Sequence, residues 1–134
     1  MPDTDAVIET LRQASDGLLF PSETDAPFEP FFWPADSPVP LTSPDIVRLC
    51  GAPAGTPVKK VKLDTFFRDA TTEEDWHNVA ERAEVAQFQS LVKSLKAALK
   101  DIAVFHVGET KMDAYVVGVA EGGYAGLKTQ VVET

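Results

Sequence analysis

Cysteine, histidine and methionine are scarce in this chain of 134 residues, which has one cysteine, two histidines and two methionines. The lone Cys50 excludes an intrachain disulfide, and its position before Gly51 favours a small buried side chain near the end of a short helix. His77 and His106 do not show the spacing of zinc ligands. A small hydrolase that uses Cys50 and a histidine is one alternative, and it requires the two groups to lie within about 2.6 to 3.2 Å of each other.

Long apolar runs and catalytic motifs are also absent. No stretch approaches the roughly 20 apolar residues that cross a membrane, and the first residues lack the basic and apolar regions of a signal peptide. We therefore expect a cytoplasmic protein without a membrane partner. The glycines of residues 122–126 do not lead into the lysine and hydroxyl residue that end a phosphate-binding loop, so this segment is interpreted as a hairpin turn. The sequence predicts neither an enzyme nor a cofactor of its own.

Basic residues are outnumbered, since 12 lysines and arginines stand against 21 acids and the formal net charge is −9. The imbalance is concentrated in residues 1–58, where nine acids face Arg12 and Arg48 and the net charge is −7. A negative field repels nucleic acid and anionic membranes but attracts basic surfaces, and it raises the rate of encounter with them by roughly 10 to 1,000 fold. The alternative is that the acidity serves solubility alone.

With 44% hydrophobic residues, a chain of this length has room for one core, and we expect a single domain over residues 1–134. Apolar side chains recur at helical spacing in three segments, and a short helical turn is expected in a fourth: residues 4–15, 43–50, 78–100 and 64–68. Ser43 suits an N-cap, Pro44 the first helical position and Gly51 the left-handed stop of the second of these helices.

Apolar runs and period-2 patterns predict four strands, at residues 59–63, 102–107, 112–120 and 127–132. The short connections between the last three favour antiparallel pairing. Residues 20–44 hold seven of the ten prolines, a composition that opposes both helix and sheet, and they are predicted to form a long loop pinned by aromatic rings. The order of elements predicts the α/β class: a single-domain α/β/α sandwich with a central mixed or antiparallel sheet.

Three consecutive acids at residues 73–75 suggest metal binding or acid–base chemistry, but a capping box explains one of them. Thr71 fits an N-cap, and Glu74 fits the third helical position, from which its carboxylate reaches back. Asp75 and Trp76 remain. A tryptophan beside an acid is favoured as a core anchor, because tryptophan is highly buried on average. If Trp76 is exposed, contact with a partner is favoured instead.

Glu23 and Thr134 are further candidates for contact with a partner. Residues 21–27 have the composition of a turn, in which Glu23 can simply be solvated. At the other end of the chain, Val131 and Val132 suggest a strand. Such a strand would hold the terminal carboxylate of Thr134 on a stiff stalk, whereas most chain ends are poorly ordered.

Six segments resemble the nuclease A inhibitor-like family, in the same order and near the same spacing: residues 15–23, 27–33, 64–67, 70–76, 115–118 and 131–134. The resemblance spans nearly the whole chain. It implies an α/β/α sandwich similar to pathogenesis-related protein 1. It also implies a protein that inhibits a metal-dependent, sugar-non-specific DNA/RNA endonuclease by binding it.

Position by position, the resemblance implies that Glu23, Asp75, Trp76 and Thr134 contact the nuclease, with Thr134 directed at its catalytic divalent metal, magnesium or manganese. The carboxylate and hydroxyl of Thr134 would stand in for phosphate oxygens. Glu23 and Asp75 would pair with Arg or Lys side chains of the nuclease, and Trp76 would be the apolar anchor. We therefore expect an acidic inhibitor that occludes the active-site cleft and does not itself bind nucleic acid. The alternative from another class is a diverged, non-catalytic interaction module of the same fold with another basic partner.

Overall fold

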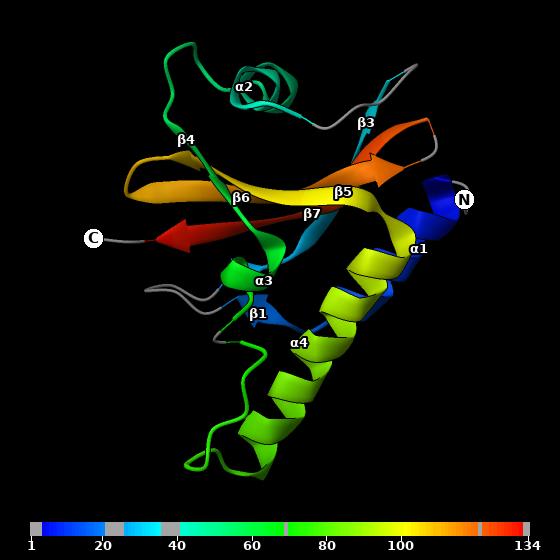
Figure 1. Cartoon of the computed structure of the whole chain (residues 1–134), viewed down its shortest axis with the longest axis vertical. Coiled ribbons are helices and arrows are strands. Elements are labelled where there is room, and N and C mark those ends of the chain that lie inside the picture. The colour runs from blue at the N-terminus through cyan, green and yellow to red at the C-terminus, as the bar shows by residue number, and fades with distance from the viewer. Residues whose placement is uncertain (1–3, 21–25, 36–40, 69, 121, 133–134) are drawn as a thin grey trace.

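A five-stranded antiparallel sheet forms the centre of the fold (Figure 1). The structure, a computed structural model, describes residues 4–20, 26–35, 41–68, 70–120 and 122–132. The strands lie in the order β3-β7-β6-β5-β4, and all four neighbouring pairs are antiparallel. Their bounds are Glu29–Pro34 for β3, Val58–Val61 for β4, Lys100–Gly108 for β5, Lys111–Ala120 for β6 and Gly123–Val132 for β7. The meander expected from the last three strands is confirmed.

Helices lie on both faces of this sheet, as the sequence predicts (Figure 1). One face carries α1 (Thr4–Ser15), α3 (Leu63–Phe66) and α4 (Val79–Ala98), and the other carries α2 (Ser43–Cys50). A second, two-stranded sheet consists of β1 (Leu19–Phe20) and β2 (Ala26–Pro27). The expected α/β class is therefore confirmed, with a wholly antiparallel central sheet.

The neighbouring inner strands β5 and β6 send alternate side chains into two separate cores. Val104 and Val116 are buried in the core beneath α1 and α4. Their neighbours Phe105 and Val117 are buried in the core beneath α2. Successive side chains of a strand point to opposite faces. Burial on both faces explains why these strands read as continuous apolar runs and not as a half-exposed alternation.

The long helix α4 buries one apolar stripe against the sheet. Its buried side chains recur every three or four residues: Val85, Phe88, Leu91, Leu95 and Ala98. The helix begins at a reciprocal cap, in which the Glu81 backbone N–H donates to Asn78 Oδ1 at 2.8 Å and the Asn78 N–H donates to Glu81 Oε1 at 3.1 Å. This cap satisfies two backbone donors that have no partner within the helix.

The capping box predicted at Thr71 and Glu74 is wrong, because no helix begins there. The Thr71 hydroxyl donates instead to the Phe67 carbonyl oxygen, at 2.7 Å. Both pairs, 71 with 74 and 78 with 81, have the spacing of a box. The apolar stripe that pulls the helix onto the core starts only at Val85, and this favours the later cap.

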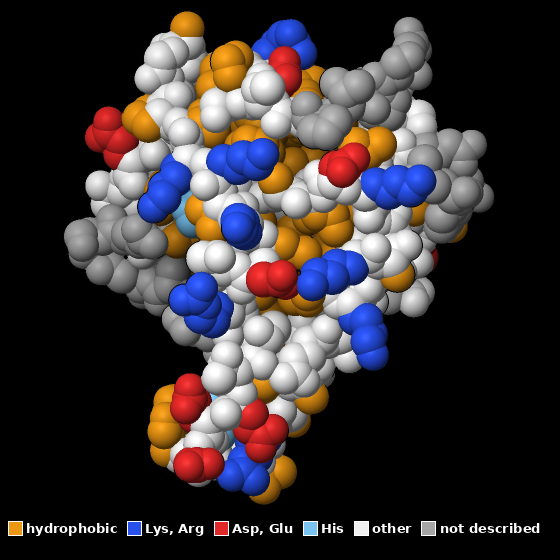
Figure 2. Space-filling model, in the orientation of Figure 1, with side chains coloured by type: hydrophobic (Ala, Val, Ile, Leu, Met, Phe, Trp, Pro, Cys, Tyr) orange, Lys and Arg blue, Asp and Glu red, His pale blue; other side chains and the backbone are white. Residues whose placement is uncertain are grey.

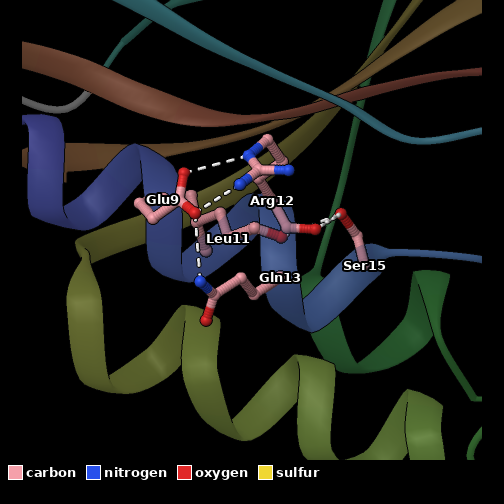
Figure 3. A network of polar contacts seen from close by, with 5 residues as sticks. All are labelled: Glu9, Leu11, Arg12, Gln13 and Ser15. Atoms are coloured by element: carbon pink, nitrogen blue, oxygen red, sulfur yellow. Dashed lines mark hydrogen bonds and ion pairs between the residues drawn. The ribbon is translucent and has the colours of Figure 1, made fainter.

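A polar network closes the end of α1 (Figure 3). The buried Ser15 hydroxyl donates to the Leu11 carbonyl oxygen at 2.8 Å. Arg12 Nε donates to Glu9 Oε2 at 2.9 Å, and this hydrogen bond holds the pKa of the Glu9 carboxyl below its usual value. Gly17 then takes a left-handed φ of 76°, as expected for the residue that ends the helix.

The long loop predicted for residues 20–44 is wrong in part, because β2 and β3 lie within it. Among the described strands, β3 lies at an edge and pairs with β7 alone. The Ala35 N–H donates to the Gly122 carbonyl oxygen at 2.9 Å, so odd-numbered residues direct their N–H groups toward β7. Pro30 and Pro34 occupy even positions, whose nitrogen atoms point away from β7. An edge strand tolerates proline there, since no ladder hydrogen bond is lost.

The hairpin turn predicted for residues 122–126 is shorter than expected, because Gly123 already belongs to β7. Gly126 lies inside that strand, where a Cβ atom would stand 1.7 Å from the Val116 carbonyl oxygen. Two of the glycines therefore serve the close approach of neighbouring backbones and not the turn itself.

Candidate functional site

The segment between α3 and α4 projects away from the sheet together with the first turn of α4 (Figure 1). We call residues 70–82 the tip; it forms the narrow protrusion in Figure 2. Side chains fasten it to α4, since Gln89 Nε2 donates to the Thr71 carbonyl oxygen at 2.8 Å and Arg82 Nε lies 3.5 Å from Glu73 Oε1. Both contacts hold the start of the tip, at Thr71 and Glu73, against α4.

Trp76 lies on this tip with 73% of its surface exposed. Its indole packs on the neighbouring His77 ring, with the ring centroids 4.3 Å apart. His77 in turn fixes the turn: its Nδ1 accepts the Glu74 backbone N–H at 3.0 Å, and its own backbone N–H donates to the Glu74 carbonyl oxygen at 3.1 Å. Val79, 86% exposed, adds apolar surface close by. The core-anchor interpretation of Trp76 is therefore wrong.

A shallow cavity of about 300 Å³ opens beside Trp76, with His77, Val85 and Phe88 in its walls. Beneath it lies the apolar stripe of α4, so an apolar side chain of a partner can lie against both the indole and the helix. Large exposed aromatic side chains that border such hollows are typical of protein-binding surfaces.

The tip is also acidic. Between residues 70 and 82 the chain has four acids, Glu73, Glu74, Asp75 and Glu81, against Arg82, a local charge of −3. Asp75 is exposed beside Trp76. Figure 2 shows acidic side chains on the protrusion. An exposed aromatic ring surrounded by carboxylates is suited to a partner that offers cationic groups around an apolar contact.

The strand β7 extends nearly to the end of the chain, as predicted. Val131 is buried and pairs with Met112, and Val132 pairs with Lys111. Thr134 lies outside the described residues, so its expected contact stays a prediction.

Glu23 also lies outside the described residues, but the strands on either side of its segment are placed. Phe20 pairs with Ala26, and the Ala26 carbonyl oxygen accepts a hydrogen bond from the buried Thr129 hydroxyl of β7 at 3.3 Å. Phe20 stacks on Phe66 of α3, with the ring centroids 4.3 Å apart. The base of the segment that carries Glu23 therefore lies between β7 and the helix that leads into the tip.

The described parts of the candidate surface, the tip and the end of β7, lie apart from each other. Asp75 and Trp76 are neighbours on the tip, whereas β7 ends at the sheet, well apart from the tip in Figure 1. A partner that touches both must be large and must cover one side of the molecule. The sequence does not reveal Val79 as part of this surface, since a valine at the first position of a helix is ordinarily a core residue.

The sheet separates Cys50 from both histidines. Cys50 packs in the core beneath α2. His106 lies on the opposite face, with its ring 5.4 Å from that of Phe66, and His77 lies on the tip. The Cys–His pair considered from the sequence is therefore not formed. Beside Cys50, burial raises the pKa of the Tyr115 hydroxyl, and the charges of Cys50 and Asp113 raise it further.

Neither a cluster of metal-ligating side chains nor a membrane-spanning helix occurs within the described ranges. Within them, no three His, Cys, Asp or Glu side chains gather in a way that could hold a metal ion. None of the helices that the structure describes is long and apolar enough to cross a membrane.

A small α/β domain with an exposed, acidic, tryptophan-bearing tip has the features of a protein-binding module. Compared with known families, the chain matches the nuclease A inhibitor-like protein family over residues 5–134 and belongs to it. A comparison with curated proteins found no match.

Proposed function

We propose that this protein inhibits a metal-dependent, sugar-non-specific endonuclease by binding over its active-site cleft. Membership of the nuclease A inhibitor-like family supports a nuclease as the partner. The observation that carries the proposal is the 73% exposure of Trp76 within an acidic tip. A nuclease that binds a polyanionic substrate presents basic groups around its cleft, and the tip offers the opposite charge.

In this proposal the tip contacts the cationic and apolar groups of the nuclease. Asp75 pairs with an Arg or Lys that otherwise binds phosphate, and Trp76 fills an apolar hollow beside it. Glu23 provides a second carboxylate, and the hydrogen bond between Thr129 of β7 and Ala26, just after its segment, supports a contact on the β7 side of the molecule. An interface of standard size buries roughly 800 Å² on each partner.

Thr134 supplies the metal contact of the proposed complex. Its oxygen atoms take the place of phosphate oxygens at the divalent cation of the nuclease, magnesium or manganese, both of which prefer oxygen ligands. β7 supports this contact, because Val131 is buried and both Val131 and Val132 are paired with β6. The protein needs no metal of its own for this role.

The test is inhibition of a purified metal-dependent, sugar-non-specific endonuclease, with plasmid DNA and RNA as substrates. The intact chain should abolish cleavage at a stoichiometric ratio. A chain ending at Glu133 should inhibit more weakly by a factor of about 30 or more, the cost of one strong contact at an interface centre. Thr134→Ser, which keeps the hydroxyl, is the matched control and should inhibit like the intact chain.

Each negative result has its own meaning in this test. Full inhibition by the shortened chain would overturn the metal contact and leave the inhibitor role standing. No inhibition by the intact chain would overturn the proposed function for that enzyme and favour a diverged interaction module with another basic partner.

A further inference from the structure

A cleft of about 720 Å³ opens at the edge of the sheet formed by β4, the edge farthest from β3. There β4, α3, the last turn of α4 and the start of β5 meet. Its apolar lining includes Val61, Leu63, Leu99 and Ile102. The volume lies within the range of roughly 300 to 1,000 Å³ that is typical of small-molecule sites. Neither the tip nor the end of β7 contributes to it, so the cleft is separate from the proposed nuclease-binding surface.

The course of the chain creates this cleft. The edge strand β4 ends at Val61, opposite Val104, whereas β5 begins four residues earlier, at Lys100. The register of β5 on β6 shifts between Lys100 and Ala103, and Asp101 takes a left-handed φ of 52°. After Val61 the chain turns into α3, so on the side away from β6 no strand of the described structure lies beside the first residues of β5. The course of the backbone therefore forms the cleft.

Lysine side chains surround the cleft. Lys60, Lys62 and Lys96 line it, together with Asp64 and Asp101. Figure 2 shows further Lys and Arg side chains around an apolar centre on this face, in a protein whose net charge is −9.

The ion pairs leave part of this charge unmatched. Lys96 Nζ lies 2.9 Å from Asp64 Oδ1, so these two side chains match each other. Within the described ranges, neither Lys60 nor Lys62 forms an ion pair. Both are exposed at the mouth of the cleft.

We propose that this cleft binds an amphipathic organic anion, with its apolar part over Leu99 and Ile102 and its carboxylate or phosphate group between Lys60 and Lys62. An apolar hollow with a few convergent polar groups is the usual form of a ligand site. Lysines on an edge strand also discourage pairing with another chain. That role accounts for charge along β4, but it does not require an apolar hollow beside it.

The first test uses four probes with the same ten-carbon chain, each kept below the concentration at which it forms micelles: decanoate, decyl phosphate, decanol and decyltrimethylammonium. Amide signals of the intact ¹⁵N-labelled chain are followed by NMR. We expect saturable shifts at residues 60–64 and 96–103 with an anionic probe, and the headgroup that binds more tightly identifies the carboxylate or phosphate class. Equal shifts with all four probes, or shifts elsewhere in the chain, would overturn the proposal.

Inorganic phosphate separates the apolar contribution from the ionic one. It should bind more weakly than the better anionic probe by at least about tenfold, because it leaves the apolar hollow unfilled. If it binds as tightly, the apolar part of the proposal is wrong.

A pair of charge variants tests the lysines. Lys60→Glu with Lys62→Glu should weaken binding of the better probe by about tenfold or more, since two attractions at the mouth become repulsions. Lys93→Glu with Lys111→Glu makes the same change in net charge on exposed lysines that do not line the cleft, and it should leave the affinity within about twofold. Equal losses in both variants would show a general charge effect and reject the site. Thermal unfolding of each variant confirms that it is folded.

Discussion

At the scale of single residues, Trp76 is the apolar contact of the proposed complex. Its 73% exposure means that replacing it removes little buried surface within the protein. We predict that Trp76→Ala changes the free energy of unfolding by less than about 0.5 kcal/mol. Inhibition of the nuclease should weaken by about 2 kcal/mol, or roughly 30-fold, because aromatic anchors dominate protein interfaces. Chemical denaturation and inhibition titrations measure the two quantities separately.

The matched control for this substitution is Gln87→Ala, which removes an exposed side chain on α4 beyond the tip. It should leave both stability and inhibition unchanged. A large loss of stability in Trp76→Ala, with inhibition restored once the folded fraction is taken into account, would mean that the indole supports the tip and does not touch the partner.

At the scale of elements, the start of α4 determines where the tip is held. Asn78→Ala removes the side-chain acceptor of the Glu81 N–H, a hydrogen bond of 2.8 Å. We predict a loss of about 1 kcal/mol in the free energy of unfolding, the usual cost of losing such a cap. Asn78→Asp keeps an oxygen acceptor and should retain the stability. Urea unfolding followed by circular dichroism measures both variants, and equal stability of Ala and Asp would show that the cap contributes nothing.

The same scale shows what the sequence can and cannot reveal. Helical spacing predicts α4 correctly because local pattern and burial agree along its stripe. β3 could not be found in this way, since Pro30 and Pro34 are acceptable only on a strand with one neighbour. Which strand lies at an edge depends on pairing with β7, almost a hundred residues away in the sequence.

The candidate site was predictable to a similar extent. The sequence singles out Asp75 and Trp76, but whether the indole is buried depends on how far α4 extends beyond the sheet, which is a tertiary property. The cleft beside Lys60 and Lys62 could not be predicted either. It exists because β4 ends opposite Val104, four residues short of the first residue of β5, Lys100. No local sequence pattern shows that offset.

At the scale of the whole molecule, the net charge of −9 should set the rate at which the protein meets a basic nuclease. Raising the salt concentration from about 0.1 M to about 1 M shortens the screening length from about 10 Å to about 3 Å. We predict that the association rate falls by at least about tenfold over this range, while the dissociation rate changes much less. Stopped-flow fluorescence of Trp76 and Trp33 can follow both rates.

A variant of the chain decides whether the overall charge or a local contact controls this rate. Lys93→Glu with Lys100→Glu changes four units of charge, from −9 to −13, on exposed residues that belong neither to the tip nor to the end of β7. If the field of the whole molecule steers the encounter, this variant should associate faster than the unchanged chain at about 0.1 M salt, and the difference should vanish at about 1 M. If the two chains associate equally fast at low salt, long-range steering is rejected. The acidity would then serve solubility, and the charged contacts of the tip would act only after the two proteins have met.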